Sequence, residues 1–143
     1  MVQWQPNEKG GMMITQFVNR FMEHKAEVRA AFAKAPPTCY KDIVDTVVKA
    51  LVVEEWGNDP WPDRHLITEI NYGDYSGTLV YVIGSWEYAL GTHWYVTVGY
   101  GSCSGCDTLQ AIQGYLDGPP TEQQLDDYMT LALHIVQGIK VME

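Results

Sequence analysis

The chain has 143 residues, of which 46% are hydrophobic and 19% charged, a composition typical of a folded globular protein. Its net charge of −9 is uneven: residues 1–53 carry a net +2 and residues 54–143 a net −11. Lys and Arg provide the affinity for phosphates and anionic membrane surfaces, so this acidity argues against direct nucleic-acid or membrane-surface binding. No apolar run approaches the roughly 20 residues that span a membrane.

Cysteine usage and the N-terminus predict a cytoplasmic location. The three cysteines are an odd number, which disfavours a secreted disulfide framework. The first nine residues lack the basic and apolar regions of a signal peptide. We therefore expect a reducing compartment.

Residues 1–10 are predicted to form an irregular arm, and residues 11–143 a single domain. Apolar residues at helical spacing predict a first helix that ends before Pro36-Pro37. Its apolar face holds Ile14, Phe17, Val18, Phe21, Val28 and Phe32. A second helix is predicted over residues 40–51, with Thr38 as its cap. This run is rich in valine, so a strand is the alternative, but charged residues on the opposite side favour a helix.

The central third predicts a three-stranded antiparallel meander over residues 65–72, 78–86 and 92–100, with a hairpin turn at residues 73–77. Side chains alternate between the two faces of a strand, so Trp94 and Tyr100 share one face. We expect the other face, which holds Tyr81, His93 and Tyr95, to be partly exposed. Such a meander needs helices over one of its faces.

Two helices are expected to complete the chain. A short helix begins near Asp107, whose side chain can cap it. A longer one follows the capping-box residues Thr121 and Gln124, with an apolar stripe from Leu125 to Ile139. The predicted fold is therefore α+β: two helices, three antiparallel strands and two more helices in chain order.

The segment of residues 100–109, YGSCSGCDTL, is the densest in reactive groups. Cys103 and Cys106 have three interpretations that the sequence leaves open. A C-x-x-C pair at a helix start favours thiolate and redox chemistry. The same pair is half of a zinc site, for which His93 on the preceding strand is the best third ligand. The third interpretation is structural: glycines, hydroxyls and Asp107 satisfy backbone groups at the helix start, and the thiols fill space.

Aromatic residues concentrate in the central part, which is typical of protein-binding surfaces. We expect a contact surface on the meander and the cysteine loop. Its candidate binding residues are Asp74, Tyr75, Trp86, His93, Trp94, Tyr95, Ser102, Ser104 and Asp107.

The turn 72–79, YGDYSGTL, and the segment 100–109 together resemble a group of small proteins encoded by tailed bacteriophages and prophages. The likeness covers residues 66–113. That group has no assigned activity, so the resemblance implies no catalytic role. It implies expression in the cytoplasm of a bacterial host, as an accessory or host-directed factor, and that the turn and the cysteine loop lie near each other.

These observations favour a non-enzymatic protein that binds a host or phage protein. No P-loop, dinucleotide fingerprint or nucleophile elbow is present. The acidic second part is compatible with an inhibitor that mimics nucleic acid, and the same surface could join two copies as a homodimer. This hypothesis requires no cofactor. The alternative is a zinc-binding or thiol-redox protein that uses Cys103 and Cys106.

Overall fold

The computed structural model describes residues 14–51, 61–73, 76–85, 92–101, 107–114 and 118–142. Within them the chain forms five helices and a four-stranded antiparallel sheet, which confirms the predicted α+β class. The elements are α1 (Ile14–Glu23), α2 (Lys25–Lys34), α3 (Tyr40–Leu51), β1 (Pro62–Gly73), β2 (Gly77–Ser85), β3 (His93–Tyr100), α4 (Thr108–Gln113), α5 (Glu122–Gln137) and β4 (Lys140–Val141). The arm predicted for residues 1–10 lies outside the described residues.

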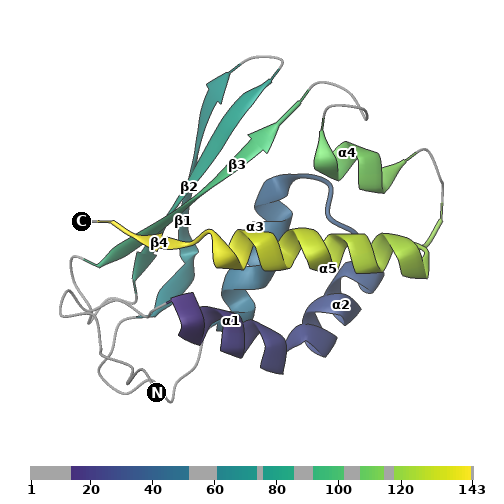
Figure 1. The fold of residues 1–143 in the computed structure, drawn as a ribbon, viewed down its shortest axis with the longest axis horizontal. Coiled ribbons are helices and arrows are strands. Elements are labelled where there is room, and N and C mark those ends of the chain that lie inside the picture. The colour runs from purple at the N-terminus through teal and green to yellow at the C-terminus, as the bar shows by residue number, and fades with distance from the viewer. Residues whose placement is uncertain are drawn as a thin grey trace.

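The helices gather on one side of the sheet (Figure 1). In sheet order the strands are β1-β2-β3-β4, so β1 and β4 are the edges. None of the described helices is long and apolar enough to cross a membrane.

The first helix expected before Pro36 is instead two helices, α1 and α2, that meet at His24. Hydrogen bonding continues through the bend, because the His24 N–H still donates to the carbonyls of Arg20 and Phe21. Both helices contact α5. Both bury their apolar side chains in the core, namely Phe17, Phe21, Val28 and Phe32.

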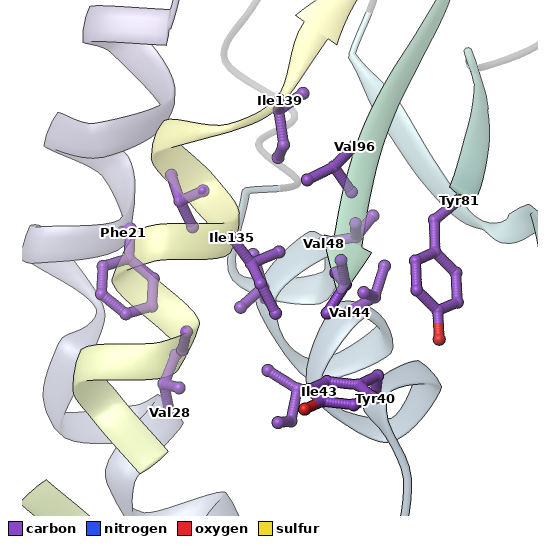
Figure 2. Close-up of a cluster of buried hydrophobic side chains, with 14 of the residues drawn as sticks. Phe21, Val28, Tyr40, Ile43, Val44, Val48, Tyr81, Val96, Ile135 and Ile139 are labelled. Atoms are coloured by element: carbon purple, nitrogen blue, oxygen red, sulfur yellow. The ribbon is translucent and has the colours of Figure 1, made fainter. Parts of the chain in front are cut away.

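The valine-rich run forms the helix α3, as predicted. All six residues expected on its inner face are buried: Tyr40, Ile43, Val44, Val47, Val48 and Leu51. Figure 2 shows several of them between α5 on one side and the sheet on the other. Thr38 was expected to cap α3 by accepting a hydrogen bond with its side chain. Instead its N–H and its hydroxyl both donate to the Asp42 carboxylate, at 2.9 and 2.8 Å.

Strand register decides which side chains face the helices. In β2 and β3, Tyr81 pairs with Val96 and Ile83 with Trp94. Directly opposed residues in an antiparallel pair share a face, so all four point to the same side, and all four are buried. The expectation that Tyr81 lies on a partly exposed face was therefore wrong.

The edge strand β1 carries an unusual distribution of side chains. Glu69 is opposite Tyr81, so it lies on the inner face, while Ile70, opposite Val80, lies on the outer face. The outer face of β1 leaves Leu66, Ile70 and Tyr72 exposed, at 50%, 37% and 66% of their surfaces. Over residues 69–72 the polar side chains Glu69 and Asn71 thus face the helical layer, and Ile70 and Tyr72 face outward.

The last helix ends earlier than predicted. The stripe of apolar residues suggested a helix as far as Ile139, but α5 ends at Gln137. Ile139 remains buried outside the helix, and the chain then adds the short strand β4 to the sheet. Val141 pairs with Trp94 in this strand, and the Met142 N–H donates to the carbonyl of His93 at 2.8 Å.

The capping box at the start of α5 gives a test of the helical layer. The Thr121 hydroxyl accepts from the Gln124 N–H, and the Gln124 side chain accepts from the Thr121 N–H. We expect Thr121→Ala to lower the free energy of unfolding by about 1 kcal/mol in urea denaturation. The control is Thr130→Ala, whose exposed hydroxyl bonds only to the Asp126 carbonyl within the helix. It should change the unfolding free energy by less than about 0.5 kcal/mol; equal losses in the two variants would contradict a specific role for the cap.

Candidate ligand-binding site

A cavity of about 290 Å³ lies where the inner face of the sheet meets the beginnings of α3 and α4. We call it the junction cavity. The start of α3 contributes Thr38, Cys39 and Tyr40; the strands contribute Glu69, Asn71, Leu79, Tyr81 and Tyr100; and the chain from the end of β3 into α4 contributes Gly101, Asp107, Leu109, Gln110 and Gln113. It therefore joins segments that are far apart in the sequence.

Two tyrosine–acceptor pairs form the sheet side of the junction cavity. The Tyr81 hydroxyl donates to Oε2 of Glu69 at 2.8 Å, and the Tyr100 hydroxyl donates to Oδ1 of Asn71 at 2.6 Å. Burial, and then the hydrogen bond to Glu69, raise the pKa of Tyr81 well above its ordinary value. Tyr81 is consequently a neutral hydrogen-bond donor at physiological pH. Figure 2 shows its ring extending from the sheet toward α3.

Asp107 connects the end of the sheet to α4. Its carboxylate is buried, and its two oxygens accept from the N–H groups of Gly101, at 2.8 Å, and Gln110, at 2.9 Å. The predicted helix cap is thus confirmed, and it also fixes the residue that follows β3. The N–H of Leu109 donates to the Tyr40 hydroxyl at 3.1 Å, which ties α4 to α3. Burial raises the pKa of Tyr40, and the nearby Asp107 carboxylate raises it further.

The residues at the start of α3 form the remaining part of the wall of the junction cavity. Cys39 is exposed and lines the junction cavity. Burial raises the pKa of Asp42, but hydrogen bonds from Thr38 and Cys39 together lower it below its ordinary value. This carboxylate therefore holds the chain that precedes α3 through charge-assisted hydrogen bonds.

The structure separates the residues that were predicted to bind a partner. Asp107 lines the junction cavity, whereas His93 is exposed and Tyr95 half-buried on the outer face of the sheet. Trp94 is fully buried and packs edge-on against Phe17, with ring centroids 5.9 Å apart, so it belongs to the core rather than to an exposed surface. The other predicted residues lie outside the described part of the chain: Asp74, Tyr75, Trp86, Ser102, Cys103, Ser104 and Cys106.

His93 lies at the opposite end of β3 from Gly101, the described residue that precedes the cysteine segment in the chain. It begins β3, while the loop follows Tyr100 at the other end of that strand. Seven residues of extended chain span roughly 23 Å. His93 lines a separate cavity on the outer face with His65, Leu66 and Gly84. Within the described residues no three His, Cys, Asp or Glu side chains are grouped to hold a metal ion.

Sequence reasoning missed most of the junction cavity. Tyr40, Glu69, Asn71 and Tyr81 come from three elements, α3, β1 and β2, and share no motif. One signal was present in β1, whose side chains form two alternating sets. The set of Leu66, Thr68, Ile70 and Tyr72 is the more apolar, and it is the set that faces outward. A strand whose polar side chains face a helical layer needs partners for them there, which is where the two tyrosines lie.

Comparison of the chain with protein-family models, with curated proteins and with solved structures found no match.

The hydrogen bonds to Asp42 give a pH-dependent test. Because the pKa of Asp42 is lowered in the folded protein, its stabilisation is present above the unfolded-state pKa, about 4, and is lost as the pH falls through the native value. We expect Asp42→Asn to reduce the free energy of unfolding by about 1 kcal/mol at pH 7. That difference should disappear toward pH 2 in urea denaturation measured across this range. Asp127→Asn is the matched control, since Asp127 accepts only from the side chain of Gln123; a pH-independent deficit in Asp42→Asn would contradict the assignment.

Proposed function

We propose that the chain is an accessory protein that binds a basic surface of a host or phage protein, as the phage-type sequence resemblance suggests. The observation that carries the proposal is a group of carboxylates without a cationic partner at one end of the molecule. Asp42, Glu69 and Asp107 all lie in or next to the wall of the junction cavity, and no described Lys, Arg or His forms an ion pair with any of them.

The arrangement of ion pairs elsewhere supports this proposal. Arg29 bonds to Glu122 and Asp126 at 2.6 Å each, so it neutralises carboxylates of α5. Lys41 pairs with Asp45 on α3. The second part of the chain contains only two basic residues, Arg64 and Lys140, and neither lines the junction cavity. Negative charge that lacks an internal counterion attracts a positively charged partner and increases its association rate.

An inhibitor that mimics nucleic acid is the more specific form of this proposal. A DNA-binding protein presents the basic surface that such a charge distribution would recognise. In that case the chain should displace its partner from DNA, and the displacement should weaken as salt is raised, because salt screens exposed charges.

The test is affinity capture from bacterial lysate, followed by a binding measurement with the purified partner. The immobilised proteins are the wild type, Glu69→Gln and Asp127→Asn, so that each variant removes one negative charge. We expect Glu69→Gln to weaken binding about tenfold, the scale of one lost charge-assisted bond, and Asp127→Asn to retain it. A partner that binds both variants with wild-type affinity, or recovery of only a second copy of the chain, would overturn the proposal.

A metal-binding or thiol-redox protein is the second candidate, and one observation favours it. Cys39 lines the junction cavity together with Gly101 and Asp107, the two residues that directly precede and follow the segment 102–106 in the chain. That segment contains Cys103 and Cys106, so the third cysteine lies at the same end of the molecule as the ends of that segment.

Elemental analysis of freshly purified protein tests this second candidate. If the cysteines hold zinc, about one equivalent should be present in the wild type and absent from the double variant Cys103→Ser, Cys106→Ser. The matched variant Cys39→Ser then reports whether the third thiol contributes. In the redox form, titration should find Cys103 and Cys106 oxidised or unusually reactive. Metal-free protein with three slowly reacting thiols would leave the cysteines with a structural role alone.

A further inference from the structure

We propose that the junction cavity is a receptor for a guanidinium group, supplied by an arginine side chain of the partner. This inference rests on the proposed function for the source of the arginine, but the chemistry of the cavity is argued from its own lining. The cavity offers hydrogen-bond acceptors and negative charge, and several of its side-chain donors are already used within the protein.

On the sheet side, the hydroxyl protons point away from a ligand. Tyr81 donates to Glu69 and Tyr100 donates to Asn71, at 2.8 and 2.6 Å. Each phenol oxygen keeps its lone pairs, and the Glu69 carboxylate keeps its second oxygen, for which no bond is formed among the described residues. A carboxylate accepts about four hydrogen bonds, so this pair can still bind several donors.

On the helical side, the same pattern holds. The Thr38 hydroxyl donates to Oδ2 of Asp42 at 2.8 Å. The Tyr40 oxygen accepts the N–H of Leu109 at 3.1 Å. The hydroxyl protons of Thr38, Tyr81 and Tyr100 therefore have acceptors inside the protein.

The side-chain amides behave in the same way. Nε2 of Gln110 donates to the Gly101 carbonyl at 3.3 Å, and Nε2 of Gln113 donates to the Pro37 carbonyl at 2.9 Å. Their Oε1 atoms are left to accept. The remaining side-chain donors are the second amide hydrogens of these two residues, the amide of Asn71, the Tyr40 hydroxyl and the weakly donating Cys39 thiol.

These features select a ligand with many donors, no acceptor and a positive charge. Guanidinium has five N–H donors and no acceptor, and its planar face stacks on aromatic rings such as those of Tyr81 and Tyr100. Among the residues that the structure describes, no Lys, Arg or His lines the cavity to compete for the carboxylates. Leu79 and Leu109 give it apolar wall against which the aliphatic part of an arginine side chain can pack.

The test uses small probes with the full chain. Nα-acetyl-arginine methylamide and its neutral isostere, Nα-acetyl-citrulline methylamide, are titrated while amide chemical shifts are followed by NMR. We expect saturable shifts at Glu69, Asn71 and Gln110 with the arginine probe, and at least tenfold weaker binding of the citrulline probe. Glu69→Gln should weaken the arginine probe about tenfold, since the Gln oxygen can still accept from Tyr81 and the fold is kept, whereas Asp127→Asn should not weaken it. Equal affinity for the two probes, or unchanged affinity in Glu69→Gln, would overturn the inference.

A second experiment distinguishes the guanidinium inference from the proposed function. It also distinguishes an arginine of the partner from a small guanidine compound as the ligand. An arginine-containing peptide from the captured partner is compared with the same peptide carrying citrulline. Selective binding of the arginine peptide supports the partner as the source. If the arginine probe binds the chain but capture from lysate recovers no protein partner, the guanidinium receptor stands and the proposed function is overturned. The ligand would then be a small guanidine compound. A partner whose binding depends on Glu69, but which binds equally well with citrulline in place of arginine, would overturn the inference and leave the proposed function standing.

Discussion

The register of β1 on β2 and of β2 on β3 is the constraint on which the rest of the structure depends. It places Tyr81 between Glu69 on one neighbouring strand and Val96 on the other, so one buried ring packs in the core and also directs its hydroxyl to a carboxylate. Side chains alternate with a period of two, so a shift by one residue would move Tyr81 outward and Val80 inward. Such a shift would expose the ring and leave Glu69 without its donor. The same pairing therefore determines both the core and the chemistry of the junction cavity.

On the side of the junction cavity formed by α4, Asp107 makes the connection between the sheet and the helices rigid. A buried carboxylate is costly unless its oxygens are hydrogen-bonded, and here each oxygen accepts from a backbone N–H. One of these donors, Gly101, follows β3, while the other belongs to the first turn of α4. Removal of the carboxylate would leave both N–H groups unsatisfied, at a cost of roughly 1–3 kcal/mol each. The residue that caps α4 thus also fixes where the helix lies relative to the strands.

Local patterns were sufficient to predict the parts of the fold that local interactions determine. The six buried residues of α3, the capping box of Thr121 and Gln124, and the cap at Asp107 all follow from spacing or from side chains within four residues of the helix start. The bend at His24 and the strand β4 could not be predicted, since both arise from packing against α5 and β3 rather than from a breaking residue or a periodic pattern. Tyr81 was placed on the wrong face because alternation within a strand does not give the register between neighbouring strands. The junction cavity was missed for the same reason, since its residues meet only after the register is set.

The inward orientation of Glu69 and Asn71 can be understood from the geometry of the covering layer. Farther along the sheet the inner positions of β2 and β3 are covered by α3 and α5 and are apolar, as Ile83 and Val96 show. At the end of the hairpin the beginnings of α3 and α4 approach without closing over β1, so its inner positions border a cavity that is open to solvent. Apolar side chains there would gain little from burial, and polar ones keep part of their hydration. A local exception to the usual inside–outside pattern is expected at binding sites, where stability is not the only requirement on the sequence. In this chain that exception coincides with the carboxylates that lack a counterion, so the charge and the strand pattern identify the same surface.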